Sequence, residues 1–273
     1  YYGWRSGALM EIQGPDDIIV PLAPGLNAGS VALVYYFAQR PENASLFSQL
    51  DDERGFPGLH TSMFGDPWER AASVEPLLPA GLNQPTMQLP FEPGRLWSYS
   101  SGPHPAWEKE GALAALDFAP ATDQSGCVPS NAWVVAVADG PVTRSENGAV
   151  VQDLVSETGV PSDGREQTGW AVLYIHIESR DRVAPGTYLR RGDPIGHPSC
   201  EGGPANGTHV HIARKYNGEW IPAGGPLPFT MDGWVVIAGD KPYQGTMVKD
   251  DLTLNAHPHG SFDTQLMRPE KSD

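Results

Sequence analysis

The chain has 273 residues, of which 33 are acidic and 18 basic, giving a net charge of −15 at pH 7. This balance argues against a nucleic-acid partner, because binding to phosphates needs clustered Lys and Arg. A hydrophobic content of 40% and eight tryptophans favour a folded protein. The longest apolar runs, 31–38 and 132–138, are far too short for a membrane span, so we expect none.

The first third of the chain differs from the rest. Residues 1–80 are predicted to form a mainly helical segment, because 27–39 and 57–72 have a helical apolar rhythm and Asn27 is a candidate cap for the first helix. Residues 81–95 are predicted to be a proline-rich linker, since proline blocks long helices and favours extended chain. The chain begins with Tyr1 rather than Met, which favours a processed or trimmed product, so the lack of a visible signal peptide does not argue against export.

From Leu96 onward the pattern changes to short strands divided by Gly, Pro and Asp turns. This pattern is typical of an antiparallel β domain. We predict a mainly β domain over 96–248, followed by an irregular, polar tail over 249–273. The predicted strands are 97–100, 114–118, 132–138, 148–153, 170–177, 188–189 with a turn at 194–196, and 209–214.

Two residues early in this domain are unusual for their surroundings. His104 lies in Ser-Gly-Pro-His-Pro, a turn context that holds an imidazole on a short, constrained loop. Asp117 lies inside the apolar run Leu-Asp-Phe-Ala, where an unpaired carboxylate is costly. The carboxylate is satisfied either by a backbone donor or an arginine, or by a metal ion.

Cys127 and Cys200 are the two cysteines of the chain. Sequence alone does not pair them, but an even number of cysteines in a secreted protein favours a disulfide. Such a bridge would constrain the unfolded chain by about 4 kcal/mol in the loop-entropy model. The alternative is a pair of buried free thiols in a cytosolic protein.

His176 lies in a strongly apolar predicted strand, two positions after Tyr174. Strand side chains alternate between faces, so we expect both rings on the same face. A core histidine bonded to a carbonyl explains the residue, and so does a role in a site.

His209 and His211 form a His-X-His pair in a predicted strand. They should therefore point the same way, roughly 7 Å apart along the strand. Two neutral imidazoles on one face suit either two ligands of one metal or a ligand beside a general base.

Together these residues form an ordered set that resembles the catalytic domain of lysostaphin-like peptidoglycan endopeptidases. These zinc metallopeptidases include the staphylolysin, or beta-lytic, branch, to which the long spacing between His104 and Asp117 is similar. The resemblance covers about Leu96 to Trp220. Its motifs are Gly-Pro-His104, Leu-Asp117-Phe-Ala, Val-Val135-Ala-X-Ala-Asp139-Gly140, Leu-Tyr-X-His176, Gly192-Asp193-Pro-Ile-Gly196 and Gly-Thr-His209-Val-His211.

The resemblance implies an antiparallel fold of the duplicated hybrid motif type and one zinc ion. His104, Asp117 and His211 would be its ligands, with the fourth position left for water. His209 would be the general base, and His176 would position the water or stabilise the oxyanion. The implied activity is a secreted zinc endopeptidase acting on peptidoglycan cross-bridges or glycine-rich peptides.

Other readings stay open at this point. The same fold could serve as a catalytically silent binding or scaffold module, or residues 1–95 could occlude the groove of a latent enzyme. Trp107, Tyr174 and Trp220 could contact substrate, although packing is the better explanation for each. A Cys127–Cys200 bridge would stiffen the rim of the groove. The four remaining histidines match none of the implied positions: His60, His197, His257 and His259.

Overall fold

The computed structural model describes residues 11–15, 19–22, 28–39, 49, 54–65, 81–107, 112–155, 162–258 and 261–270. The chain divides into two compact units, Tyr1–Glu75 and Pro76–Asp273. Each unit is described by itself, and the site lies in the second.

The first unit contains a short hairpin as well as helices. Strands β1 (Glu11–Gln13) and β2 (Ile19–Pro21) pair antiparallel. Helix α2 (Ala28–Ala38) lies where the first helix is predicted, while the candidate cap Asn27 is outside the described residues. Helix α4 (Phe56–Phe64) ends before the glycine that follows it, and 66–72 of the second predicted helix are also outside the described residues. No helix in the described parts of the chain has the length and apolar character needed to cross a membrane.

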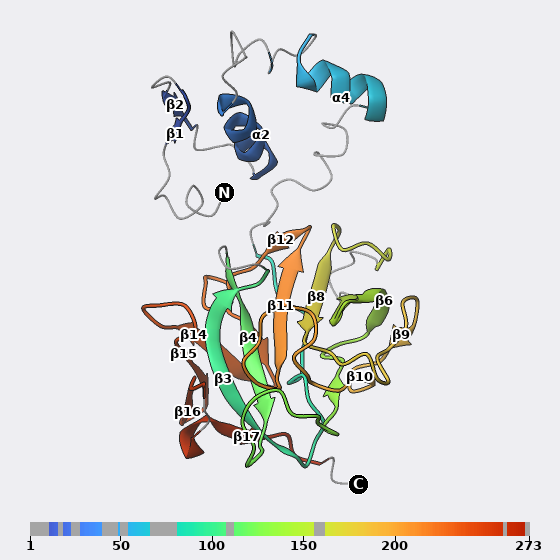
Figure 1. Cartoon of the computed structure of the whole chain (residues 1–273), viewed down its shortest axis with the longest axis vertical. Helices are drawn as coiled ribbons and strands as arrows, with labels where there is room; N and C mark the ends of the chain where they lie inside the picture. Colours follow the sequence, from blue (N-terminus) through green and yellow to red (C-terminus); the bar gives the residue numbers. More distant parts are fainter. Residues whose placement is uncertain are drawn as a thin grey trace. The chain divides into compact units, whose positions relative to one another are not determined.

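The second unit is built from antiparallel β-sheets, which confirms the predicted fold class (Figure 1). Its largest sheet has the strand order β17-β3-β4-β11-β8-β7-β6-β9, with β12 added beside β11. These strands are β3 (Leu96–Pro105), β4 (Leu113–Pro120), β6 (Gly140–Glu146), β7 (Ala149–Asp153), β8 (Trp170–Ile175), β9 (Tyr188–Leu189), β11 (Val210–Tyr216), β12 (Glu219–Trp220) and β17 (Gln265–Met267).

Two smaller sheets complete this unit. One pairs β5 (Val134–Val135) with β10 (Pro194–Gly196). The other has the order β13-β14-β15-β16, formed by β13 (Thr230–Met231), β14 (Trp234–Ala238), β15 (Gly245–Lys249) and β16 (Leu252–Asn255). The sequence rhythm did not predict this four-stranded sheet, because its strands are short and partly exposed and so lack a clear alternation.

The alternation of side chains along the large sheet separates its core face from its site face. On β4, Leu116 and Phe118 belong to the main hydrophobic core, whereas Ala115 belongs to a small cluster that also contains Ala213 of β11. Asp117 lies between two core residues in sequence and therefore projects with Ala115. The core face is apolar, and the opposite face carries the polar site.

Residues 81–95 are more than a linker. Their backbone is largely extended, but Met87, Leu89 and Phe91 are fully buried in the main core. Arg214 of β11 is also fully buried and donates hydrogen bonds to Gln84 and to a loop carbonyl, and this burial lowers the pKa of Arg214 to about 9. The segment is thus an integral part of the second unit.

The expectation of an irregular C-terminal tail over 249–273 is wrong. Strand β16 pairs with β15, and β17 adds a strand beside β3 at the edge of the large sheet. Arg268 anchors this C-terminal region, because its guanidinium donates hydrogen bonds to the carbonyl of Phe91, to Gln88 and to Asp232. A segment held in place by a charged side chain needs no periodic apolar residues, so the sequence pattern did not predict these strands.

Candidate metal centre

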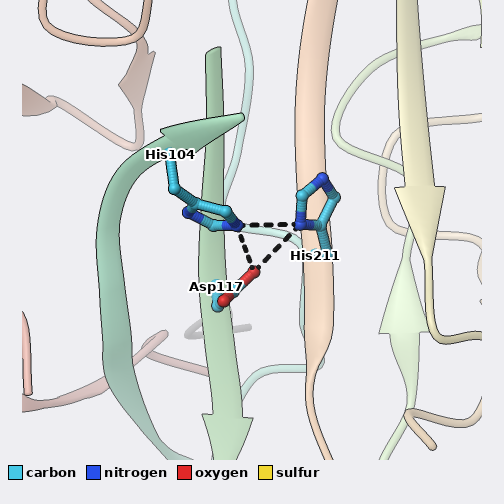
Figure 2. Close-up of side chains that lie close together, drawn as sticks. All are labelled: His104, Asp117 and His211. Atoms are coloured by element: carbon cyan, nitrogen blue, oxygen red, sulfur yellow. Dashed lines mark hydrogen bonds and ion pairs between the residues drawn. The ribbon is translucent and has the colours of Figure 1, made fainter. Parts of the chain in front are cut away.

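Three predicted residues meet on neighbouring strands of the large sheet. His104 lies on β3, Asp117 on β4 and His211 on β11, and the register places His211 directly opposite Asp117. Nε2 of His104 is 3.0 Å from Nδ1 of His211, and Oδ1 of Asp117 is 3.3 Å and 3.2 Å from these two nitrogens. Figure 2 shows both rings and the carboxylate turned toward one point.

Backbone carbonyls fix the tautomer of both imidazoles. Nδ1–H of His104 donates to the carbonyl of Gly102 at 2.8 Å, and Nε2–H of His211 donates to the carbonyl of Ala106 at 3.1 Å. A carbonyl only accepts, so each of these nitrogens carries the proton of its neutral ring. In the neutral rings, the facing nitrogens, Nε2 of His104 and Nδ1 of His211, are therefore the ones that hold lone pairs and can bind a metal ion.

This donor set fits a metal ion. Two imidazole lone pairs and a carboxylate oxygen converge at close range, and Oδ1 of Asp117 is buried without a hydrogen-bond donor among the described residues. Burial alone raises the pKa of Asp117, but the nearby imidazoles of His104 and His209 outweigh it and hold that pKa well below its usual range. Burial lowers the pKa of His211, which keeps its ring neutral. Burial alone lowers the pKa of His104, but the carboxylate of Asp117 outweighs it and raises that pKa, so a metal ion bound here would take the place of a proton. Two histidines and one carboxylate are ligands that zinc accepts.

His209 lies beside this centre, just before β11. Its Nδ1–H donates to the carbonyl of Gly207 at 2.7 Å, so Nε2 carries the lone pair. That nitrogen is 3.7 Å from Oδ2 of Asp117. His209 and His211 both line the groove, as the alternation of the strand predicts.

His176 reaches the groove by a different route from the one predicted. Tyr174 is fully buried in the core, whereas His176 lines the groove, so the expectation of a shared face is wrong. The reason is that His176 has a φ of +66°, which ends β8 at Ile175 and turns the next side chain. Its Nδ1–H donates to the carbonyl of Glu201 at 2.8 Å, and its ring centroid lies 4.3 Å from that of His209.

Cys127 and Cys200 form a disulfide, which confirms the predicted bridge. The bridge joins two segments that support the histidines outside the ligand set. Gly126 accepts a hydrogen bond from the backbone N–H of Thr208, and Ser199 accepts one from that of His209. Both of these contacts lie within one residue of a bridged cysteine.

All five candidate side chains line one groove with a volume of about 1260 Å³. Trp107 forms part of its wall and is 43% exposed. A glycine-rich loop, 202–207, forms another part, and Pro258 from the C-terminal region a third. Burial of the ligands and exposure of the surrounding wall together suit a site that meets an extended ligand.

Other candidates lie away from the groove. His197 is buried and donates Nδ1–H to the carbonyl of Ala132, and His60 belongs to α4 in the first unit. Trp220 packs against the apolar side chains of the site face, outside the groove lining. His257 is exposed, and His259 lies outside the described residues.

Among the groove residues that sequence reasoning did not single out is Tyr243. It comes from the turn between β14 and β15, and its ring stacks on His104 with centroids 4.7 Å apart. A tyrosine between Pro and Gln, in a turn of a sheet that was not predicted, has no characteristic spacing, so no pattern in the sequence pointed to it.

Comparison with known proteins supports the fold. No family model and no curated protein matches the sequence. Two solved structures overlap only in part: the catalytic domain of lysostaphin, an antimicrobial peptidase from Staphylococcus simulans (20% identity, 46% of this chain, 87% of that one, TM-score 0.31), and a zinc-containing peptidase from Vibrio cholerae (19%, 55%, 39%, TM-score 0.31). Pseudoalterin, described as an M23 metalloprotease from the deep sea, is 22% identical, with 63% of this chain and 95% of that chain covered and a TM-score of 0.50. This chain thus has a fold similar to that of the M23 metalloprotease pseudoalterin.

Proposed function

We propose that the chain is a secreted zinc metalloendopeptidase that hydrolyses peptide bonds in bacterial peptidoglycan cross-bridges or in glycine-rich peptides. The observation that carries the proposal is the pair of carbonyl-fixed tautomers at His104 and His211, whose lone pairs converge with the buried carboxylate of Asp117. Without a cation, these lone pairs and the carboxylate repel one another. A bound metal cation removes that repulsion. The fold similarity to a metalloprotease agrees with it.

His104, Asp117 and His211 would hold the zinc. A zinc ion there supplies Lewis acidity toward the scissile carbonyl and toward water. Because these three side chains use one ligand atom each, a position is left open, as hydrolysis requires.

His209 would remove a proton from the attacking water. Its Nε2 carries a lone pair because Nδ1–H is bonded to the carbonyl of Gly207. Once protonated, the ring would be a cation 3.7 Å from the carboxylate of Asp117, which stabilises the charge. The proton is then available for the leaving amine.

His176 would orient the water rather than donate to an oxyanion. Its Nδ1–H is bonded to Glu201, so the neutral ring turns an accepting Nε2 toward the groove. Burial, reinforced by His209, lowers the pKa of His176 to about 4, and the ring therefore stays neutral near neutral pH. A neutral acceptor holds a water hydrogen but offers nothing to a negative oxygen.

The substrate would be an extended peptide with small side chains. Gly202, Gly203 and Gly207 line the groove together with His176 and His209. These glycines would place backbone, rather than side chains, beside the substrate. This surface suits peptides whose own residues are small. The acidic net charge of the chain gives no attraction to anionic wall polymers, so recognition would rest on groove contacts.

Metal content and hydrolysis test the proposal together. The purified full chain is expected to bind close to one zinc ion and to cleave a fluorogenic glycyl peptide. His211→Ala and Asp117→Asn should lose both properties, whereas His209→Ala should keep the zinc and lose cleavage. His257→Ala, an exposed histidine outside the groove lining, is the matched control. A zinc-loaded wild type that binds peptide but never cleaves it would point to the silent module of the same fold.

A separate experiment tests whether the N-terminal residues occlude the groove of a latent enzyme. Activity is compared before and after removal of residues 1–75, which form a unit separate from the one that carries the groove. A latent enzyme gains activity on removal, and a constitutive one does not.

A further inference from the structure

Three asparagines of this chain are directly followed by glycine, in the pairs 147–148, 206–207 and 217–218. An asparagine in this context is chemically labile, because glycine places no side chain over the backbone nitrogen that can attack the asparagine amide. The attack also needs a backbone that can bring this nitrogen against the side chain. The three pairs therefore differ in how far the fold permits the reaction.

Two of the pairs are held in tight hairpin turns. Asn147 joins β6 to β7 with a φ of +47°, and Asn217 joins β11 to β12 with a φ of +49°. Asparagine followed by glycine is a preferred sequence for such two-residue turns, in which both residues have positive φ. The side-chain oxygen of Asn217 also accepts the N–H of Gly169 at 2.8 Å. Ring closure at either pair would break the hairpin, so the fold protects these two amides.

Asn206 has neither form of protection. It is exposed on the glycine-rich loop of the groove, outside the strands, and its φ is negative. Among the residues that the structure describes, neither its side-chain amide nor the N–H of Gly207 has a hydrogen-bond partner. A Cβ at Gly207 would meet its nearest atom, the carbonyl oxygen of Gly126, at 3.7 Å, so the space beside this nitrogen is open.

We propose that Asn206 is a site of spontaneous deamidation. Hydroxide removes the proton from the backbone nitrogen of Gly207, and this nitrogen forms a bond to Cγ of Asn206. The bond between Cγ and the amide nitrogen then breaks, and the nitrogen leaves as ammonia with a proton from water. Solvent water opens the resulting succinimide at one of its two carbonyls. One opening leaves an aspartyl residue, and the other leaves an isoaspartyl residue whose main chain runs through Cγ. Nothing is oxidised or reduced.

Both products change the surroundings of His209. Each adds a carboxylate to the groove loop, and the isoaspartyl form also adds a methylene group to the main chain directly before Gly207. The carbonyl of Gly207 accepts Nδ1–H of His209 at 2.7 Å. Thr208, between them, is anchored by hydrogen bonds to the carbonyls of Gly126 and Val128. The longer chain therefore displaces the peptide group of Gly207 against a fixed neighbour and weakens the contact that sets the tautomer of His209.

Peptide mapping over time tests the inference. The full chain is incubated at mildly alkaline pH, and samples are digested at acidic pH and analysed by mass spectrometry. Position 206 should convert to aspartyl and isoaspartyl forms faster than positions 147 and 217, and faster as the pH rises. The modified protein, separated by ion exchange through its added charge, should keep its zinc. Its kcat/KM for a glycyl peptide should fall by about 10²-fold, the size of effect that a misplaced reacting group produces.

Two variants serve as a matched pair. Asn206→Gln keeps an amide but needs a larger ring to react, so its activity should persist relative to its own starting value. Asn147→Gly suits the positive φ of the hairpin and removes another exposed asparagine of this kind. Because Asn147 lies outside the groove lining, this variant should lose activity as fast as the wild type does.

The site of modification is independent of the proposed peptidase function, whereas its effect on kcat/KM rests on that function. No conversion at position 206, or faster conversion at 147 or 217, would overturn the inference. Conversion at 206 that leaves kcat/KM and the ring N–H resonance of His209 unchanged in NMR spectra would overturn the effect on the site. A wild type that never cleaves the peptide would refute the peptidase proposal alone, because the mapping and the His209 resonance still decide the inference.

Discussion

The carbonyl oxygen of Glu201 accepts the Nδ1–H of His176 at 2.8 Å, and Glu201 directly follows the disulfide residue Cys200. On the other side of that cysteine, Ser199 donates its N–H to the carbonyl of His176 at 2.7 Å. The cross-linked segment thus holds the backbone and the ring of His176 at once. Placement of this histidine depends on a short loop rather than on the sheet.

Substitution of His176 by asparagine tests its role without disturbing this loop. Asparagine tolerates a positive φ better than most residues, and its amide can donate to the same carbonyl. We expect zinc binding and Tm to stay near wild type while kcat falls by about 10²-fold, the size of effect that a misplaced reacting water produces. Steady-state kinetics and metal analysis measure this, and an unchanged kcat would remove His176 from the mechanism.

Loss of the disulfide should affect activity more than metal binding. In the variant Cys127→Ala with Cys200→Ala, the free energy of unfolding should fall by about 4 kcal/mol in the loop-entropy model. The loops around His176 and His209 would loosen, so kcat should fall while zinc stays near one per chain. Denaturant unfolding and metal analysis give the two readouts. A parallel loss of zinc and activity would show that the bridge supports the ligands instead.

A single carboxylate, that of Glu166, pairs with two cations of the large sheet, Lys215 on β11 and Arg144 on β6. Its Oε2 is 2.6 Å from Nζ of Lys215, and its Oε1 is 2.9 Å from Nε of Arg144. Glu166→Gln leaves the buried Lys215 without its counterion and should lower the free energy of unfolding by about 1–3 kcal/mol. Glu178→Gln is the control, since its partner Arg180 is exposed and surface pairs contribute little.

The pH dependence of this effect has a definite sign. Burial alone raises the pKa of Glu166, but hydrogen bonds from Arg144 and Lys215 outweigh it and lower the pKa. A carboxyl group whose pKa falls on folding stabilises the native state above its unfolded pKa of about 4.3, and this contribution is lost as the pH falls through the folded value. The difference between wild type and Glu166→Gln should therefore shrink below about pH 4. A difference that stays constant with pH would contradict the ion-pair explanation.

Close packing at Gly102 predicts a large response to one methyl group. In Gly102→Ala the added Cβ would collide with the backbone of Gln244, so one of the two loops must shift, at about 1–3 kcal/mol of stability. Gly207→Ala is the control for stability, because its Cβ would meet the nearest atom at an ordinary 3.7 Å. Thermal unfolding of both variants measures the difference, and equal Tm values would contradict the packing argument.

The local sequence pattern predicts some features of the site, whereas others depend on which strands pair and in which register. The shared face of His209 and His211 follows from strand alternation alone. His104 and Asp117 were singled out by their odd surroundings, but their meeting with His211 depends on which strands pair. Strand alternation gave the wrong face for His176, because the left-handed backbone of this residue ends the alternation.

The C-terminal region shows the other limit. Its strands are short, and their anchoring relies on polar contacts such as those of Arg268. Hydrophobic periodicity does not predict polar contacts of this kind, so neither β17 nor the position of Tyr243 could be predicted from the sequence. The fold class, by contrast, follows from many short strands with turns between them.

The three side chains of the metal centre come from three adjacent strands that are distant in sequence, with His104 and His211 separated by 107 residues. The donor set therefore exists only when β4 has paired with both β3 and β11, and the unfolded chain has no equivalent. An ion that binds there would bind the native state alone and would favour it by mass action. If the site binds such an ion, thermodynamic linkage would make the free metal concentration a determinant of how much of the chain is folded.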